Sequence, residues 1–135
     1  MHGMTLIEVM VVVVILAILA GVVAPKVFGN REQAQITKVK QDIRAIEAAL
    51  SMYRMHNFQY PSTEQGLEAL VKQPSTDPVP KNWQAGGYLP RVPKDPWGEN
   101  YHYLSPGSHG EFDLYSNGVP NSGDNKKIGN WNLAD

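Results

Sequence analysis

The first 24 residues constrain this chain more than any other stretch, because they predict an apolar helix that contains a single charge. Between Met4 and Ala24 the only charged residue is Glu8. A helix of roughly 20 apolar residues is long enough to cross a bilayer. A carboxylate inside such a helix is costly, and an acid within a membrane segment is by default a functional residue. The alternative is that Glu8 lies at the depth of the lipid headgroups, where its charge costs little.

The residues around Glu8 form a motif: Gly3, then residues 4–8 (MTLIE), then an unbroken apolar run. This motif resembles the class III signal of type IV pilins and type II secretion pseudopilins. The resemblance implies that a prepilin peptidase cuts between Gly3 and Met4 and methylates the new amino terminus. A free amine at Met4 and a carboxylate at Glu8 are each costly in lipid. Pairing the amine of one subunit with Glu8 of a neighbour would offset that cost and set the axial register of a filament.

The resemblance also divides the chain. It implies a leader at residues 1–3, a hydrophobic helix at residues 4–27 and a periplasmic globular domain at residues 28–135. The helix would span the inner membrane once before assembly and lie in the filament core afterwards. Leaders of this family are usually basic, but residues 1–3 contain no lysine or arginine. We therefore expect either a start codon upstream of Met1 or an unusually short leader.

Gly21 and Pro25 interrupt the apolar run near its end. A proline inside a helix removes one backbone hydrogen bond and usually kinks or breaks the helix. Filaments of the pilin family have a locally unwound helix near this proline, so the resemblance implies a helix break at Gly21 and Pro25. A simple kink is an equally good interpretation of the residues alone.

Beyond the apolar run, one stripe of apolar residues predicts that the helix continues to Arg54. The stripe has spacings of 3, 4, 3, 4 and 3 residues and consists of Ile36, Val39, Ile43, Ile46, Leu50 and Tyr53. Residues 62–65 (STEQ) predict a capping box before a short helix at residues 67–73. Alternating residues predict strands at 101–104, 111–116 and 127–132. The expected fold class is α+β, with a long N-terminal helix packed on a small antiparallel sheet as in pilins.

Motifs in the second half narrow the resemblance to the G-class family of major pseudopilins in type II secretion. They are Tyr60-Pro61, Gln65-Gly66-Leu67, Asp95-Pro96-Trp97-Gly98 and Asp113-Leu114-Tyr115-Ser116. The resemblance implies a structural subunit that polymerises into a helical filament and drives export of folded proteins across the outer membrane. The implied partners are other copies of the chain, minor pseudopilins, prepilin peptidase, an inner-membrane assembly platform and membrane lipid.

Proteins resembling this one hold a calcium ion in the loop after the last of these motifs. Calcium takes 6–8 oxygen ligands, several of them carboxylates. Pro120, Lys126 and Lys127 stand where the family pattern places acids. The remaining oxygen donors include Asp124, Asn121 and the carbonyl of Asn117. A metal-free loop held by side-chain to backbone hydrogen bonds is therefore favoured over calcium, and a lysine ammonium paired with Asp124 is a further alternative.

Composition excludes several other functions. The net charge of −1 gives no electrostatic basis for binding nucleic acid. The absence of cysteine argues against a type IV pilin used for adhesion, twitching or DNA uptake, because those pilins usually carry a C-terminal disulfide loop. A membrane-anchored binding domain that never polymerises is an alternative of another class. Ser116 lacks the setting of a nucleophile elbow and the histidines lack metal-ligand spacing, so we expect no enzyme.

Overall fold

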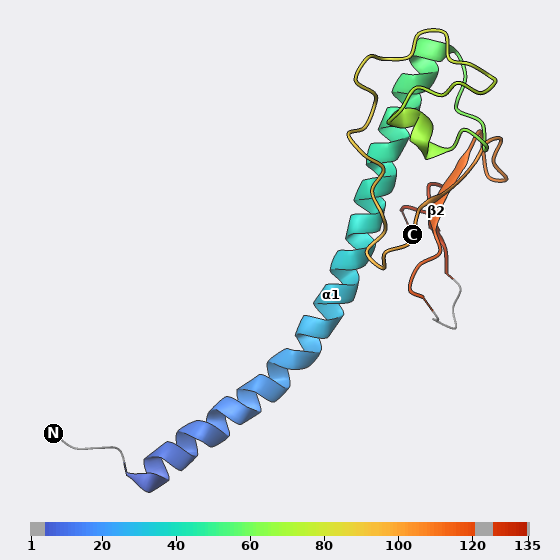
Figure 1. Ribbon diagram of the computed structural model, residues 1–135. Helices are drawn as coiled ribbons and strands as arrows, with labels where there is room; N and C mark the ends of the chain where they lie inside the picture. Colours follow the sequence, from blue (N-terminus) through green and yellow to red (C-terminus); the bar gives the residue numbers. More distant parts are fainter. Residues whose placement is uncertain (1–4, 121–125, 135) are drawn as a thin grey trace. The chain divides into compact units, whose positions relative to one another are not determined.

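The computed structural model describes residues 5–120 and 126–134, and gives the helical backbone but not the side chains of residues 21–30. It contains a long helix, α1 (Leu6–Asn57), and a short 3-10 helix, η1 (Leu67–Leu70). Three strands follow, β1 (His102–Leu104), β2 (Asp113–Ser116) and β3 (Ile128–Gly129). The chain divides into two compact units, Met1–Ile36 and Thr37–Asp135 (Figure 1).

The first unit is the N-terminal part of α1. Residues 5–20 of this unit are all exposed, although most of them are apolar. Among the side chains that the structure describes, no helix combines the length and the apolar character needed to cross a membrane. The helical backbone continues through Gly21 and Pro25 and ends at Asn57, three residues beyond the predicted Arg54. The break at Gly21 and Pro25, which the resemblance places in filaments, stays a prediction.

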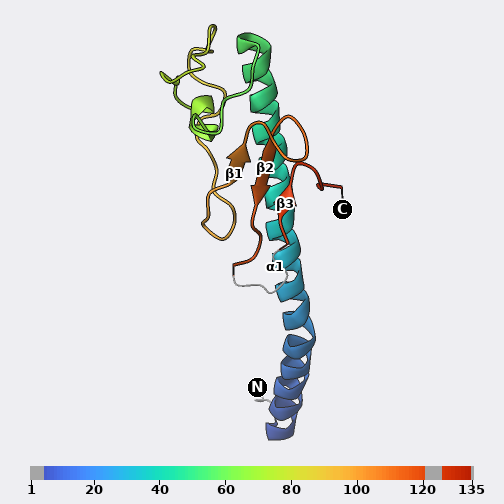
Figure 2. The ribbon, with the colours of Figure 1, turned by 90° about the vertical axis from the view of Figure 1, so that its right-hand side faces the viewer.

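In the second unit, the sheet packs along α1 as the sequence predicts (Figures 1 and 2). The strands are antiparallel in the order β1-β2-β3. Five residues of the predicted stripe are completely buried: Val39, Ile43, Ile46, Leu50 and Tyr53. From the sheet side the core receives Tyr103, Phe112 and Leu114. Each buried aliphatic side chain of this kind contributes roughly 1.5–3 kcal/mol, so this stripe is the main apolar support of the fold.

The predicted capping box forms, but it closes a turn instead of starting a helix. The Ser62 N–H donates to Gln65 Oε1 at 2.9 Å, and the Gln65 N–H donates to Ser62 Oγ at 3.1 Å. Gly66 follows with a positive φ of 65°, which is outside the helical region. The amide of Gln65 then donates to the carbonyls of Thr76 and Pro78. The helix predicted at residues 67–73 is consequently a 3-10 helix of four residues.

The third strand is also shorter than predicted, because two asparagines turn the chain. Gly129 N–H donates to the Oδ1 of Asn132 at 2.9 Å, which forms a turn directly after β3. The side chain of Asn130 bonds to the backbone of Phe112 and Leu114. The Asn130 N–H also donates to the Leu114 carbonyl at 2.9 Å. Residues 130–132 are thus held beside the sheet by one backbone bond and by the two asparagine side chains.

Candidate functional site

Glu8 is part of a hydrogen-bonded cap at the N-terminus of α1. The Glu8 N–H donates to Thr5 Oγ1 at 3.2 Å, and the Thr5 N–H donates to Glu8 Oε2 at 3.2 Å. This is the reciprocal geometry of a capping box. The role of Thr5 was missed at the level of sequence, although the spacing Thr-x-x-Glu is the usual signal for it. Gly3 and Met4 lie outside the described residues.

The cap explains how a carboxylate is accommodated at the start of an apolar helix. The unpaired N–H groups and the macrodipole give a helix N-terminus partial positive charge, which favours an acid there. Glu8 is exposed, and only its Oε2 atom accepts the bond from Thr5. A carboxylate has about four lone-pair sites. Glu8 therefore keeps acceptor capacity for a cation from outside its own helix.

An apolar groove lies on α1 in the same stretch of sequence as Glu8. It has a volume of about 310 Å³ and is lined by Ile7, Met10, Val11, Val14 and Ile15. These residues recur at the spacing of one helix face. A groove of this kind fits the side chains of another apolar helix. The first unit thus presents a cap with an available carboxylate and a helix-packing surface.

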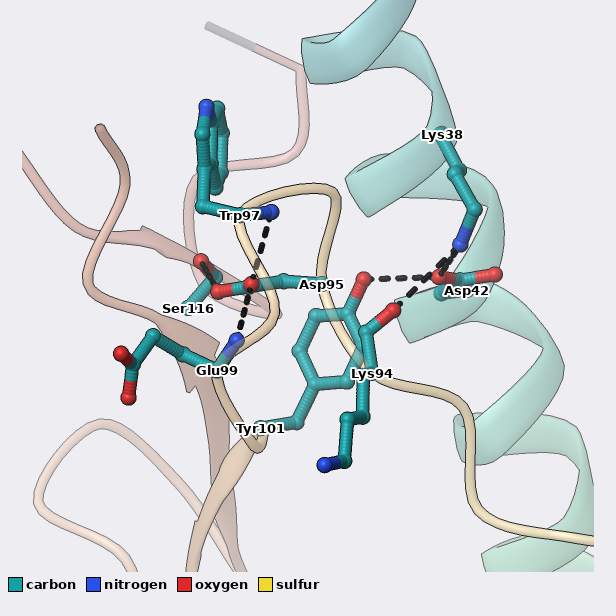
Figure 3. Close-up of polar contacts among 8 residues, drawn as sticks. All are labelled: Lys38, Asp42, Lys94, Asp95, Trp97, Glu99, Tyr101 and Ser116. Atoms are coloured by element: carbon teal, nitrogen blue, oxygen red, sulfur yellow. Dashed lines mark hydrogen bonds and ion pairs between the residues drawn. The ribbon is translucent and has the colours of Figure 1, made fainter. Parts of the chain in front are cut away.

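In the second unit, the buried carboxylate of Asp95 joins the 95–99 turn to β2 (Figure 3). Its Oδ1 accepts the N–H groups of Trp97 at 3.1 Å and Glu99 at 2.8 Å. Its Oδ2 accepts the hydroxyl of Ser116 at 2.9 Å. Asp95 is only 4% exposed, so these three bonds replace its hydration. The Asp95-Pro96-Trp97-Gly98 motif is therefore structural.

A second polar network joins α1 to the segments before β1 (Figure 3). The Tyr101 hydroxyl donates to Asp42 Oδ2 at 2.7 Å, and Lys38 Nζ contacts the same oxygen at 2.7 Å. Lys38 also donates to the carbonyl of Lys94. Burial raises the pKa of Tyr101 far above its usual range, and the bond to Asp42 adds to this effect. Tyr101 is consequently held as a neutral donor.

Asp113 is the second buried acid among the described residues of this unit. It accepts the N–H groups of Ser108 and His109, each at 3.0 Å, and contacts His109 Nδ1 at 3.1 Å. The imidazole of His109 stacks on Trp131 with ring centroids 3.9 Å apart. Burial acts to raise the pKa of Asp113, but the hydrogen bonds from Ser108 and His109 outweigh it and lower the pKa. This cluster fastens the loop after β1 to the C-terminal segment.

The described ends of the loop considered as a calcium site are held by other contacts. The Asn117 Nδ2 lies 3.0 Å from His102 Nε2, and Lys127 Nζ lies over the Tyr115 ring, 4.7 Å from its centroid. A Cβ on Gly118, whose φ is +80°, would lie 2.6 Å from the carbonyl oxygen of Lys126, so the neck of the loop requires glycine. Asn121 and Asp124 lie outside the described residues.

These ends fit a calcium ion poorly. None of the described residues 117–120 and 126–128 is acidic. Lys127 brings a positive charge to the neck, and the Asn117 side chain is directed to His102. Within the described ranges, no group of three or more His, Cys, Asp or Glu residues could hold a metal ion. The loop is thus closed by backbone packing, a hydrogen bond and a cation–π contact at its described ends.

Two family models match the chain. The family described as "Type II secretion system (T2SS), protein G" matches residues 26–131. The "Prokaryotic N-terminal methylation motif" matches residues 1–24. Together the two matches cover both the capped apolar helix and the domain with the buried acids.

Relatives and a solved structure agree with these matches. A protein of Pseudomonas aeruginosa named "Type II secretion system core protein G" is 57% identical over 133 residues, which cover 96% of this chain and 94% of the relative. A Klebsiella pneumoniae protein of the same name is 52% identical over 98% of this chain and 96% of its own length. The crystal structure of the major pseudopilin from the type 2 secretion system of enterohaemorrhagic Escherichia coli superposes with a TM-score of 0.68. It is 47% identical and covers 77% of this chain and 92% of that chain.

Proposed function

Because the chain belongs to the family of type II secretion system protein G, the major pseudopilin, we propose that its copies join through Glu8 and the amino terminus of Met4 into a helical filament. The protein is a structural subunit of the pseudopilus, anchored in the membrane and facing the periplasm. The filament pushes folded proteins through the outer membrane. The alternative of a type IV pilin has no support among these relatives.

The capped Glu8 supports this proposal. One of its oxygens accepts the bond from Thr5, and the carboxylate keeps capacity for a partner. The apolar groove in the same stretch of α1 supplies a surface for the helix of another copy. In such a low-dielectric contact, removing one partner of an ion pair costs about 3–5 kcal/mol. Charge pairing at Glu8 would therefore select one register out of many that the apolar surfaces allow.

Three variants test the role of Glu8. Glu8→Ala and Glu8→Gln should insert into membranes normally but form few filaments by electron microscopy, because both lack the negative charge. Thr5→Ala is the matched control, since it removes the side-chain acceptor of the cap but keeps the carboxylate. It should still form filaments. Filaments of Glu8→Gln as abundant as those of the unmodified chain would contradict charge pairing and leave Glu8 with its role in the helix cap alone. A membrane-inserted, unmodified chain that forms no filaments would favour the non-polymerising anchor.

Processing is the second part of the proposal. Prepilin peptidase cuts between Gly3 and Met4 and methylates Met4, which frees the amine that pairs with Glu8. The precursor spans the inner membrane once through residues 4–27, and an assembly platform and minor pseudopilins act on it there. Mass spectrometry of the protein recovered from membranes should show a chain that begins at a methylated Met4. A protein that keeps residues 1–3 in intact filaments would contradict this step.

We further propose that the loop at residues 117–128 holds no calcium ion in the working protein. The positive charge of Lys127 and the engaged side chain of Asn117 support this proposal. The thermal midpoint should then be unchanged, within about 1 °C, when a chelator or millimolar calcium is added, because a bound ion would stabilise the fold by mass action. A clear drop of the midpoint with chelator would contradict the proposal.

The proposed role is structural, without a catalytic step. The buried acids Asp95 and Asp113 are each occupied by three hydrogen-bond contacts from their own domain. A catalytic acid or base must instead reach a substrate proton. We therefore expect substitutions of these two acids to lower the stability of the protein and not to remove a catalytic activity.

A further inference from the structure

An exposed apolar patch lies at the C-terminal end of α1. We call it the helix-end patch and define it as Met52, Met55 and Phe58, whose exposed fractions are 42%, 70% and 77%. The three residues follow one another at intervals of three, across the last two turns of the helix and the first residue after it. Within the described part of the chain, no other segment covers them.

The helix-end patch continues an uncharged stripe on the outward face of the second unit. Ala45, Ala48, Met52 and Met55 recur at spacings of 3, 4 and 3 residues, and all four are exposed. This spacing places them on one side of a helix. The buried stripe from Val39 to Tyr53 occupies another side of the same helix. In the part of α1 after residue 37, the helix thus has one apolar face covered by the sheet and one left open.

Phe58 carries a second unfavourable feature besides its exposure. Its φ is +67°, a left-handed conformation that bulky side chains rarely adopt. Glycine or asparagine is the usual residue at this position after a helix. A large ring that is 77% exposed gains little from burial within the chain. The strain of this backbone conformation is a reason to look for a role outside the folded monomer.

We propose that the helix-end patch contacts a neighbouring copy of this chain within the filament. This inference rests on the proposed function. The patch lies on the part of α1 that belongs to the second unit, and the assembly motif lies at the other end of the same helix. Its three side chains expose about 400 Å² in total. A stable interface buries about 800 Å² per partner, so the patch is too small to hold a dimer by itself.

The small area therefore identifies the partner as a copy that is already positioned by other contacts. In a filament every subunit repeats the same contact, and a weak surface adds to the axial contacts made by α1. A soluble protein that binds the patch alone would find too little area. A neighbouring subunit can use so small a contact area, because the contacts of its own α1 already hold it in position.

Methionine oxidation tests this inference on the unmodified chain. Dilute hydrogen peroxide should convert Met52 and Met55 to sulfoxides rapidly in the detergent-solubilised monomer, and at least about fivefold more slowly in filaments, because oxidation follows exposure. Mass spectrometry of peptides gives the two rates, and electron microscopy shows independently that filaments are present. Equal rates in monomer and filament would overturn the inference but leave the proposed function intact. An absence of filaments would count against the proposed function instead.

A substitution at Phe58 provides a second measurement. Phe58→Asn removes the ring and suits the left-handed backbone, so the monomer should melt at or above the temperature of the unmodified chain. Its filament yield should fall about threefold or more, because a central apolar contact is lost. Leu104→Thr is the matched control. Leu104 lies on β1 and is 40% exposed, so this variant removes an exposed apolar side chain outside the patch and should leave the filament yield unchanged. Normal filament yield from Phe58→Asn would contradict the proposal.

Discussion

The three hydrogen bonds to Asp95 allow a quantitative test of what holds the second unit together. A hydrogen bond to a charged group contributes about 1.5–3 kcal/mol, although neighbouring bonds are not additive. Asp95→Ala removes all three bonds and leaves the Ser116 hydroxyl buried without its acceptor. We expect a loss of about 3–4 kcal/mol, which lowers the midpoint of a domain of this size by about 12–25 °C.

Asp95→Asn should cost much less, for a geometric reason. Both backbone donors, from Trp97 and Glu99, meet the same oxygen, Oδ1. An asparagine with its oxygen in that place keeps both bonds, and its amide can donate to Ser116 Oγ, which has two lone pairs. The remaining loss of stability arises because the Ser116 hydroxyl no longer has an acceptor for its proton. We expect about 1–2 kcal/mol.

Tryptophan fluorescence of the full chain in mild detergent gives the measurement, with denaturant unfolding as a second probe. All three tryptophans, Trp83, Trp97 and Trp131, lie in the second unit, so the signal reports that unit. The reasoning would be refuted by an Asp95→Asn variant as unstable as Asp95→Ala, because charge rather than hydrogen-bond geometry would then hold the 95–99 turn.

Three further predictions concern the same unit. Tyr53→Phe should stabilise the protein by about 1 kcal/mol in denaturant titrations, because the Tyr53 hydroxyl is buried without a partner in the described part of the chain; a loss of stability would reveal a hidden acceptor. Acid should remove the contribution of Asp113 to the free energy of unfolding, because the pKa of Asp113 in the folded protein is lowered below the ordinary 3.8. This contribution is complete above about pH 5 and is lost as the pH falls through the folded pKa. His109→Ala should make the free energy of unfolding less dependent on pH between about pH 2 and 5, and an unchanged pH dependence would contradict this role of His109. Tyr101→Phe should cost about 1–2 kcal/mol by loss of the bond to Asp42, measured in the same titrations, and a neutral result would mean that the helix–sheet network contributes nothing.

Periodicity predicted the architecture because it is a local property of the chain. The 3-4 spacing from Ile36 to Tyr53 identifies a face that must be buried. Ile36 is half-buried, and the members from Val39 onward are completely buried. Alternation in residues 111–116 similarly predicted a strand, and β2 forms at Asp113–Ser116 within that range. The capping box of residues 62–65 was also predicted correctly, since its two bonds join neighbours in sequence. The prediction of a helix at residues 67–73 after the box was wrong, because Gly66 has a positive φ and only a short 3-10 helix follows it.

The sequence by itself determined that this chain carries an acid at the start of an apolar helix and an amphipathic helix after it, because both are patterns of nearby residues. Only the tertiary structure decided what the buried polar residues do. Ser116 meets Asp95 across 21 positions and Tyr101 meets Asp42 across 59. Likewise the exposure of Met55 and Phe58 depends on which side of α1 the sheet covers. Contacts between distant residues are set by packing of the whole domain, which no local pattern encodes.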